Sequence, residues 1–176
     1  LKEEYNYLIP DNYQETREEK LEYRTSPTNI GYSLTSVISA YFLGLIDIDK
    51  CMDYLEKIVI TIDSLEKWNG DLYNWYHIKT KKALPPRFIS SVDSGNLVAS
   101  LIVTLEFLRE NEQDDLVMIV ESLIEETNFK KLYTKKDVLS IGFDIEKNQL
   151  SIYNYNKFAS ESRLTSFIAI CKGDIP

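Results

Sequence analysis

The chain contains very little histidine and cysteine. His77 is its one histidine, and Cys51 and Cys171 are its two cysteines, in 176 residues. A metal site built from several histidines is therefore excluded, and a Ser-His-Asp or Cys-His mechanism would have to use His77. Two cysteines form neither a disulfide framework nor a zinc site. Both lie within helical patterns, so we expect buried free thiols, with no metal and no cofactor.

Positive charge is also scarce. The chain has 20 Lys and Arg against 28 Asp and Glu, a formal net charge of -8 and a pI near 4.8. Nucleic acid is therefore not expected as a partner, because its binding depends on basic side chains that neutralise phosphates. No uninterrupted apolar run approaches the roughly 20 residues that span a bilayer, and the N-terminus lacks the layout of a signal peptide. We expect a soluble chain.

The aromatic residues are mostly tyrosines. The chain has 12 Tyr against 7 Phe and 2 Trp, and 44% of its residues are hydrophobic, enough to bury a core. Rings with a polar group suit a groove that is half apolar and half wet, which is the surface that a sugar offers. Tyrosines that only fill half-exposed helix positions would give the same composition, so both interpretations stay open.

Apolar residues recur at steps of three and four in five segments, which predicts five helices. The first is capped by Thr25 or Ser26, has Pro27 at its first position and ends at Gly44. The others are predicted from an Asp47 cap to Leu65, from an Asp93 or Ser94 cap to Leu108, over 114–126, and from about Ser160 to Cys171. A short turn joins the first two helices, so we expect antiparallel neighbours.

The remaining segments are less regular. Residues 1–24 are polar and aromatic without a period and are predicted to be an extended segment leading into the first helix. Residues 66–90 form a long connection, and long loops are usually functional. Alternating apolar residues over 137–153, with a turn at 146–149, predict an inserted β-hairpin. The expected fold is mainly α, with paired antiparallel helices and one small β-hairpin.

Polar and aromatic runs lie at or near three predicted helix starts, at 24–31, 74–76 and 91–96. Glycoside chemistry usually needs two carboxylates about 5 to 10 Å apart, and the candidates beside such runs are Asp11, Glu15, Asp93 and Glu161. Asp93 is either a helix N-cap or an acceptor for sugar hydroxyls, and Glu161 is either a first-turn acid or a catalytic group. Trp75 is either a stacking platform or part of the core.

Six runs taken in order resemble the central glucoamylase-like region of cyclic β-1,2-glucan synthases. They are 9–15 (IPDNYQE), 24–31 (RTSPTNIG), 72–76 (LYNWY), 86–97 (PRFISSVDSGNL), 139–143 (LSIGF) and 159–176 (ASESRLTSFIAICKGDIP). In that family the full protein is a very large, membrane-associated transferase that builds and cyclises β-1,2-linked glucose chains. Its central region is an α/α toroid credited with the transglycosylation that closes the ring. The resemblance implies that residues 1–176 are a single partial domain, the N-terminal portion of such a toroid.

The resemblance also implies a set of sugar-facing residues. They are Asn12, Tyr13, Arg24, Asn29, Asn74, Trp75, Tyr76, Asp93, Asn96, Glu161 and Arg163. The family's paired catalytic glutamates follow the segment that matches 161–176, so we expect this chain to be catalytically silent alone. It departs from the family at His77, where Asp or Asn is usual, and at 156–158, where a leucine-rich stretch is usual.

Three functions are compatible with the sequence. The leading one is the substrate-binding part of a β-1,2-glucan transglycosylase, whose partners are a β-glucan oligosaccharide and the rest of the parent polypeptide, on the cytoplasmic side of a membrane-associated protein. The second is a glucoamylase-like glycoside hydrolase that uses Asp93 and Glu161. The third is a helical interaction module, in which the apolar edge of an open arc docks onto the parent or forms a homo-oligomer.

Overall fold

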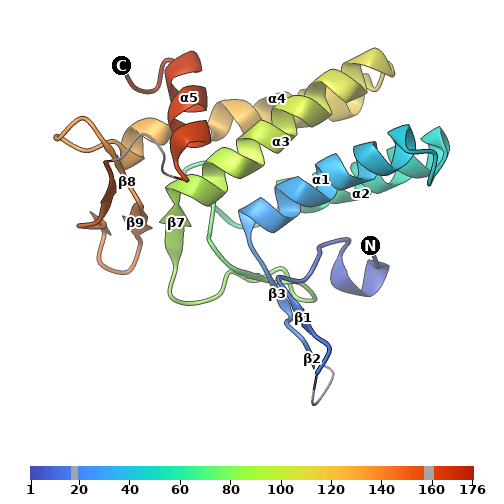
Figure 1. The fold of residues 1–176 in the computed structure, drawn as a ribbon, viewed down its shortest axis with the longest axis horizontal. Helices are drawn as coiled ribbons and strands as arrows, with labels where there is room; N and C mark the ends of the chain where they lie inside the picture. The colour runs from blue at the N-terminus through green and yellow to red at the C-terminus, as the bar shows by residue number, and fades with distance from the viewer. Residues whose placement is uncertain (17–19, 157–160) are drawn as a thin grey trace.

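The computed structural model describes residues 1–16, 20–156 and 161–176, and there the helices lie together with short strands along one side (Figure 1). Within these residues the chain forms five α-helices and two 3-10 turns. The helices are α1 (Pro27–Phe42), α2 (Ile48–Ser64), α3 (Ser91–Glu110), α4 (Asp114–Glu126) and α5 (Arg163–Cys171), and the 3-10 turns are Glu3–Tyr5 and Phe129–Leu132. The prediction of a mainly α chain with small β elements is thus confirmed.

The first two helices begin at the predicted caps. The Ser26 hydroxyl accepts a hydrogen bond from the backbone N–H of Asn29, and Pro27 is the first residue of α1. The Asp47 carboxylate accepts in the same way from the N–H of Lys50 at the start of α2. Gly44 ends the first helical segment with a φ of 69°, a left-handed conformation that favours glycine.

The predicted cap of α3 is wrong. Ser90 caps this helix, because its hydroxyl accepts from the backbone N–H of Asp93 at 3.2 Å. The helix follows directly on strand β7 (Phe88–Ser90), so Asp93 lies inside the first helical turn and its side chain is not used for capping. Helix α4 has the predicted bounds, whereas α5 begins at Arg163, and the predicted start at Ser160 lies outside the described residues.

The strands are two or three residues long and form small antiparallel sheets. Four sheets have two strands each: β1 (Tyr13–Gln14) with β2 (Lys20–Leu21), β3 (Arg24–Thr25) with β6 (Tyr76–His77), β4 (Lys67–Trp68) with β5 (Asp71–Leu72), and β8 (Leu139–Ser140) with β11 (Asn154–Tyr155). The fifth has three strands, with β9 (Gly142–Asp144) between β7 and β10 (Gln149–Leu150). The turn before β10 is the predicted one. However, β9 also pairs with β7, so the segment 137–153 is joined to the start of α3.

Other expectations for the irregular segments are corrected. The segment 1–24 is not simply extended, because it contains the turn Glu3–Tyr5 and buries Leu8 to 2% exposure. Only one of the two cysteines is buried: Cys51 lies in the core, where burial raises the pKa of its thiol, and Cys171 is exposed.

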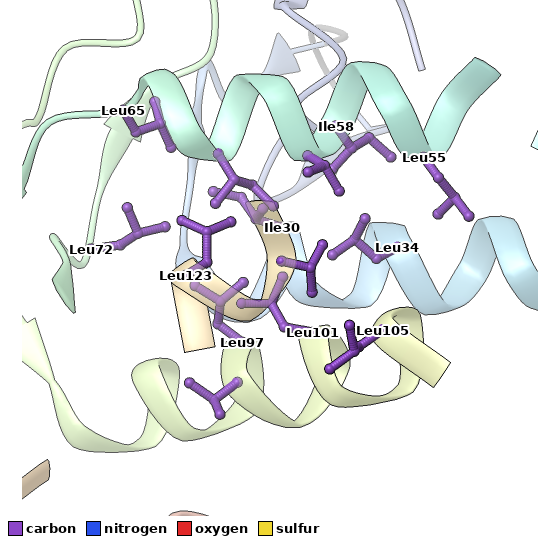
Figure 2. Packing of buried hydrophobic residues seen from close by; sticks show 14 of the residues in the cluster. Ile30, Leu34, Leu55, Ile58, Leu65, Leu72, Leu97, Leu101, Leu105 and Leu123 are labelled. Carbon is purple, nitrogen blue, oxygen red and sulfur yellow. The ribbon is translucent and has the colours of Figure 1, made fainter. Parts of the chain in front are cut away.

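The core lies between the four long helices. Helix α3 is central, since it packs on α1, α4 and α5. Figure 2 shows the apolar side chains of α1, α2 and α3 pointing toward one another, among them Ile30, Leu34, Leu55, Ile58, Leu97 and Leu101, all buried. By length and composition α3 could cross a membrane, with a hydropathy of 1.3, but 61% of that stretch is buried inside the fold.

Two glycines allow the helices to approach α3 closely. A Cβ on Gly31 of α1 would lie 2.8 Å from Ser100 Oγ and 3.2 Å from the Cα of Leu97. A Cβ on Gly95 of α3 would lie 2.8 Å from the Cα of Thr165 in α5. Thr165 also donates to the carbonyl of Ser91 at 3.0 Å, which holds α5 against the first turns of α3.

Replacing Gly95 by Ala is therefore expected to destabilise the fold by about 2 kcal/mol, because the added methyl meets the backbone of α5 and overpacked cores lose about 1 to 3 kcal/mol. The measurement is urea denaturation followed by circular dichroism. Ser36→Ala, at an exposed position of α1, is the matched control. Equal midpoints for Gly95→Ala and the wild type would show that α5 moves away from α3 without cost.

Candidate functional site

The first turns of α1 and α3 bring three polar side chains together. The Thr28 hydroxyl donates to Asp93 Oδ1 at 2.6 Å, and Asn96 Nδ2 donates to that hydroxyl at 3.1 Å. Thr28 and Asp93 are 65 residues apart in sequence. Asp93 and Asn96 are one helical turn apart and so share a face of α3. The close approach of α1 at Gly31 allows the short Thr28 side chain to reach them.

A loop residue occupies the second oxygen of Asp93. With its carboxamide nitrogen toward the carboxylate, Asn74 donates to Asp93 Oδ2 at 2.9 Å and accepts from Trp75 Nε1 at 3.0 Å. The opposite orientation would place the amide oxygen against the carboxylate, so only this one satisfies both neighbours. We call Thr28, Asn74, Trp75, Asp93 and Asn96 the Asp93 network. Two of its four hydrogen bonds end on Asp93, and the other two end on Thr28 and Asn74, the residues that donate to Asp93.

A second group lies beside this network. Asp11 accepts from Asn29 Nδ2 at 3.0 Å through one oxygen and pairs with Arg24 at 3.4 Å through the other. The Arg24 guanidinium lies over the Trp75 ring, 4.1 Å from the ring centroid. Arg24 thus connects this Asp11 cluster (Asp11, Arg24, Asn29) to the Asp93 network. It also covers one face of Trp75, which leaves at most the other face for stacking on a ligand.

Backbone hydrogen bonds fix the loops that carry these residues. The N–H of Asn74 donates to the carbonyl of Phe88 at 2.8 Å, and the carbonyl of Trp75 accepts from the N–H of Leu84 at 2.8 Å. Asp11 N–H donates to the carbonyl of Arg24 at 2.7 Å, and Arg24 pairs with His77 across β3 and β6. All eight side chains of the two groups are half-buried, so they are held in place yet remain accessible.

Five predicted residues are not members of these two groups, and three of them come from the loops and strands near β1 and β6. Tyr76 is fully buried, and its hydroxyl donates to the carbonyl of Glu66 while accepting from the N–H of Tyr73 at 2.9 Å. This position gives Tyr76 a structural role in the core. Asn12 is exposed next to the Asp11 cluster, and Tyr13 is 49% exposed on β1.

Glu161 and Arg163 lie at the start of α5, and both are exposed. Arg163 lines a cavity of about 590 Å³ between α5 and the pair β8 and β11, together with Tyr155 of β11. Burial, and then the negative charges of Glu161 and Asp93, raise the pKa of Tyr155. Tyr155 therefore lies within electrostatic range of both carboxylates, and its phenol stays protonated at neutral pH.

Three residues of this region were not among the predicted site residues. The sequence indicates Asp11 only as a candidate catalytic carboxylate, and it indicates no role for Thr28 or Tyr155. Thr28 is in the run 24–31, and its position in the first turn of a helix that packs on α3 is the one signal that could have indicated it. Among the described residues, no group of three or more His, Cys, Asp or Glu side chains could hold a metal ion.

Comparison with known proteins gives a sequence relative. The chain is 47% identical over 107 residues to the cyclic β-(1,2)-glucan synthase NdvB of Rhizobium meliloti (strain 1021). The resemblance to a cyclic β-1,2-glucan synthase is confirmed. The match to the synthase covers 61% of this chain and 4% of the synthase itself, so this chain corresponds to a small part of its length. No family model matches the chain.

Solved structures share the fold at low sequence identity. An endo-β-1,2-glucanase from Chitinophaga pinensis, in complex with sophorotriose and glucose, matches with a TM-score of 0.77 at 18% identity, over 92% of this chain and 39% of the glucanase. A glucoamylase-like protein from Bacteroides caccae matches with a TM-score of 0.74 at 14% identity, over 85% of this chain and 38% of its own. The fold is thus one that β-1,2-glucanases and glucoamylase-like proteins share.

Proposed function

We propose that this chain is the substrate-binding part of a transglycosylase similar to cyclic β-1,2-glucan synthases, acting on β-1,2-linked glucose chains. The observation that carries the proposal is the Asp93 network, in which two helix N-termini and one loop hold a carboxylate and two carboxamides at an accessible surface. Such groups bind hydroxyls, and the Trp75 ring beside them can stack on the C–H face of a sugar. The relative and the fold neighbours point to the same class of substrate.

The proposal includes a larger architecture. Helices α1 to α5 would be paired antiparallel helices in the N-terminal portion of an α/α toroid, and the rest of the parent polypeptide would complete it. The row Leu164, Phe167 and Ile170 on α5 is 42%, 65% and 53% exposed, and it offers an apolar surface for that contact. The catalytic glutamates would belong to the completing part, and the parent would be membrane-associated with this part on the cytoplasmic side.

The alternative of a hydrolase that uses Asp93 and Glu161 has less support. Both oxygens of Asp93 accept hydrogen bonds from protein donors, which suits a binding carboxylate better than a proton donor. Glu161 is exposed and is outside the Asp93 network. The one observation that relates the two carboxylates is that the charges of both raise the pKa of Tyr155.

Isothermal titration with linear β-1,2-glucooligosaccharides tests the proposal, and a β-1,4 series of the same lengths is the control. Measurable binding of the β-1,2 series with at least about tenfold weaker binding of the β-1,4 series is expected, because the polar groups are fixed in position before the ligand arrives. Absence of binding to both series by a folded sample would contradict the proposal for this chain.

A further inference from the structure

The direction of the hydrogen bonds around Thr28 determines which atoms of the site remain for a ligand. A threonine hydroxyl has one proton to donate, and Thr28 donates it to Asp93 at 2.6 Å. Toward Asn96 this hydroxyl can therefore only accept, so Asn96 must present its Nδ2 to Thr28, as the 3.1 Å contact shows. The atom of Asn96 that remains is its carbonyl oxygen, Oδ1.

Two other donors of the network are also bonded internally. The Trp75 indole N–H is bonded to Asn74, and the Asn74 amide is bonded to Asp93. Asn96 Oδ1, by contrast, accepts no hydrogen bond within the part of the chain that the structure describes. The acceptors that remain around Asp93 are Asn96 Oδ1 and the free lone pairs of the Asp93 carboxylate, and the Asn74 and Asn96 amides each keep one further N–H.

We propose that Thr28 is a positioning residue that fixes the Asn96 carboxamide so that Asn96 Oδ1 and Asp93 accept hydrogen bonds from hydroxyl groups of an uncharged sugar. This inference rests on the proposed function and specifies it, because a carboxylate with a free carbonyl oxygen beside it favours ligands that donate hydrogen bonds and disfavours anionic ones. Thr28 acts through Asp93 and Asn96 and need not touch the ligand.

Loss of the Thr28 hydroxyl releases this arrangement. In Thr28→Val the side chain keeps its shape, but Asn96 Nδ2 loses its acceptor and Asp93 loses a donor. The strongest acceptor left near Asn96 is then Asp93 itself, one helical turn away, so the carboxamide can turn toward it. The carbonyl oxygen would no longer be held for a ligand hydroxyl.

The test compares three variants in the whole chain. Thr28→Val removes the hydroxyl, and Thr28→Ser restores it on a smaller side chain. Thr35→Val is the matched control, because Thr35 lies on the same helix and its hydroxyl donates only to the carbonyl of Tyr32, at 3.2 Å. The probe is linear β-1,2-linked glucotriose, titrated by calorimetry. Hydrogen exchange of the Asn96 side-chain amide, followed by NMR without ligand, is the second measurement.

Thr28→Val is expected to bind the trisaccharide about tenfold more weakly than the wild type. Hydrogen exchange of its Asn96 side-chain amide should be faster, and exchange of the Asn74 side-chain amide should change less. Thr28→Ser should stay within about threefold of the wild type in both measurements, and Thr35→Val should not change. A purely structural role would lower the melting temperature of Thr28→Val without a selective change at Asn96.

Deoxyfluoro analogues of the trisaccharide test the ligand side, since fluorine cannot donate a hydrogen bond. At least one analogue should bind the wild type more weakly than the parent trisaccharide does. The same analogue and the parent trisaccharide should bind Thr28→Val equally, because the two changes remove the same contact. Additive losses for every analogue would overturn the assignment to Asn96 and Asp93.

The outcomes separate this inference from the proposed function. Binding by the wild type and equally by Thr28→Val, or no rescue by Thr28→Ser, would overturn the inference and leave the proposed function in place. No binding by the wild type would remove the proposed function and with it the ligand role of Asn96. Amide exchange would still decide whether Thr28 orients Asn96, since unchanged exchange in Thr28→Val excludes that orientation.

Discussion

Asp93→Ala is expected to weaken the binding of a linear β-1,2-glucan by at least about 30-fold. Asp93 accepts two of the four hydrogen bonds of the network, and its removal leaves the Thr28 hydroxyl and the Asn74 amide without their partner. A hydrogen bond from a ligand hydroxyl to the Asp93 carboxylate contributes about 1.5 to 3 kcal/mol, and loss of about 2 kcal/mol corresponds to about 30-fold in the dissociation constant. Calorimetric titration with a β-1,2-glucooligosaccharide measures the effect.

Two further variants make this result specific. Asp93→Asn keeps the shape but presents an N–H₂ group to one of the two donors, so an intermediate loss is expected. Asp115→Ala removes a carboxylate at an exposed position of α4 and should leave binding unchanged. Wild-type affinity in Asp93→Ala, in a sample that melts at the wild-type temperature, would show that the network is not the binding site.

The local features of the fold were predictable because they depend on neighbouring residues. The Ser26 and Asp47 caps each bond to a backbone N–H three residues away, and the bounds of α4 follow from a single helical stripe. The cap of α3 could not be predicted in this way. Ser90, Ser94 and Asp93 are all good capping residues, and the choice among them depends on where β7 ends, which is set by its pairing with β9.

The candidate site was predictable in its parts and not in its arrangement. The residue type marks Asp93 as a candidate and the family resemblance adds Asn96, but the residue that joins them, Thr28, lies 65 and 68 positions away. Trp75 and Tyr76 are adjacent and aromatic, yet Tyr76 is fully buried while Trp75 is half-buried under Arg24. Which of two neighbouring rings faces the core depends on the packing of a loop, and no local pattern determines it.

A buried carboxyl far from this site makes the second strong prediction. Asp71 on β5 is 1% exposed, and its Oδ2 lies 3.3 Å from Lys131 Nζ. Its Oδ1 has no partner within the described residues. Burial raises the pKa of Asp71 to about 7, with a further increase from Asp174, while the positive charges of Lys131 and Lys172 act in the opposite direction. Desolvation thus outweighs the ion pair at this position.

This raised pKa determines the sign of a stability effect. In the unfolded chain Asp71 titrates near its ordinary value of 3.8, so between about pH 4 and 7 the folded state holds a proton that the unfolded state has lost. The stabilising contribution is therefore fully present below about pH 4 and is lost as the pH rises through 7. Since each pKa unit corresponds to about 1.4 kcal/mol, it amounts to about 4 kcal/mol in total.

The comparison of wild type with Asp71→Asn isolates this contribution, because asparagine has the same shape and does not titrate. Urea denaturation at pH 4 to 8 should show the wild type losing stability relative to Asp71→Asn as the pH rises. Lys131 also donates to the carbonyl of Asn69, so the substitution does not leave it without a partner. Asp115→Asn, at an exposed position, should run parallel to the wild type. If the free energy of unfolding of the wild type instead rises relative to that of Asp71→Asn with increasing pH, the attraction to Lys131 exceeds the cost of burying the carboxylate. Asp71 would then be ionised in the folded chain.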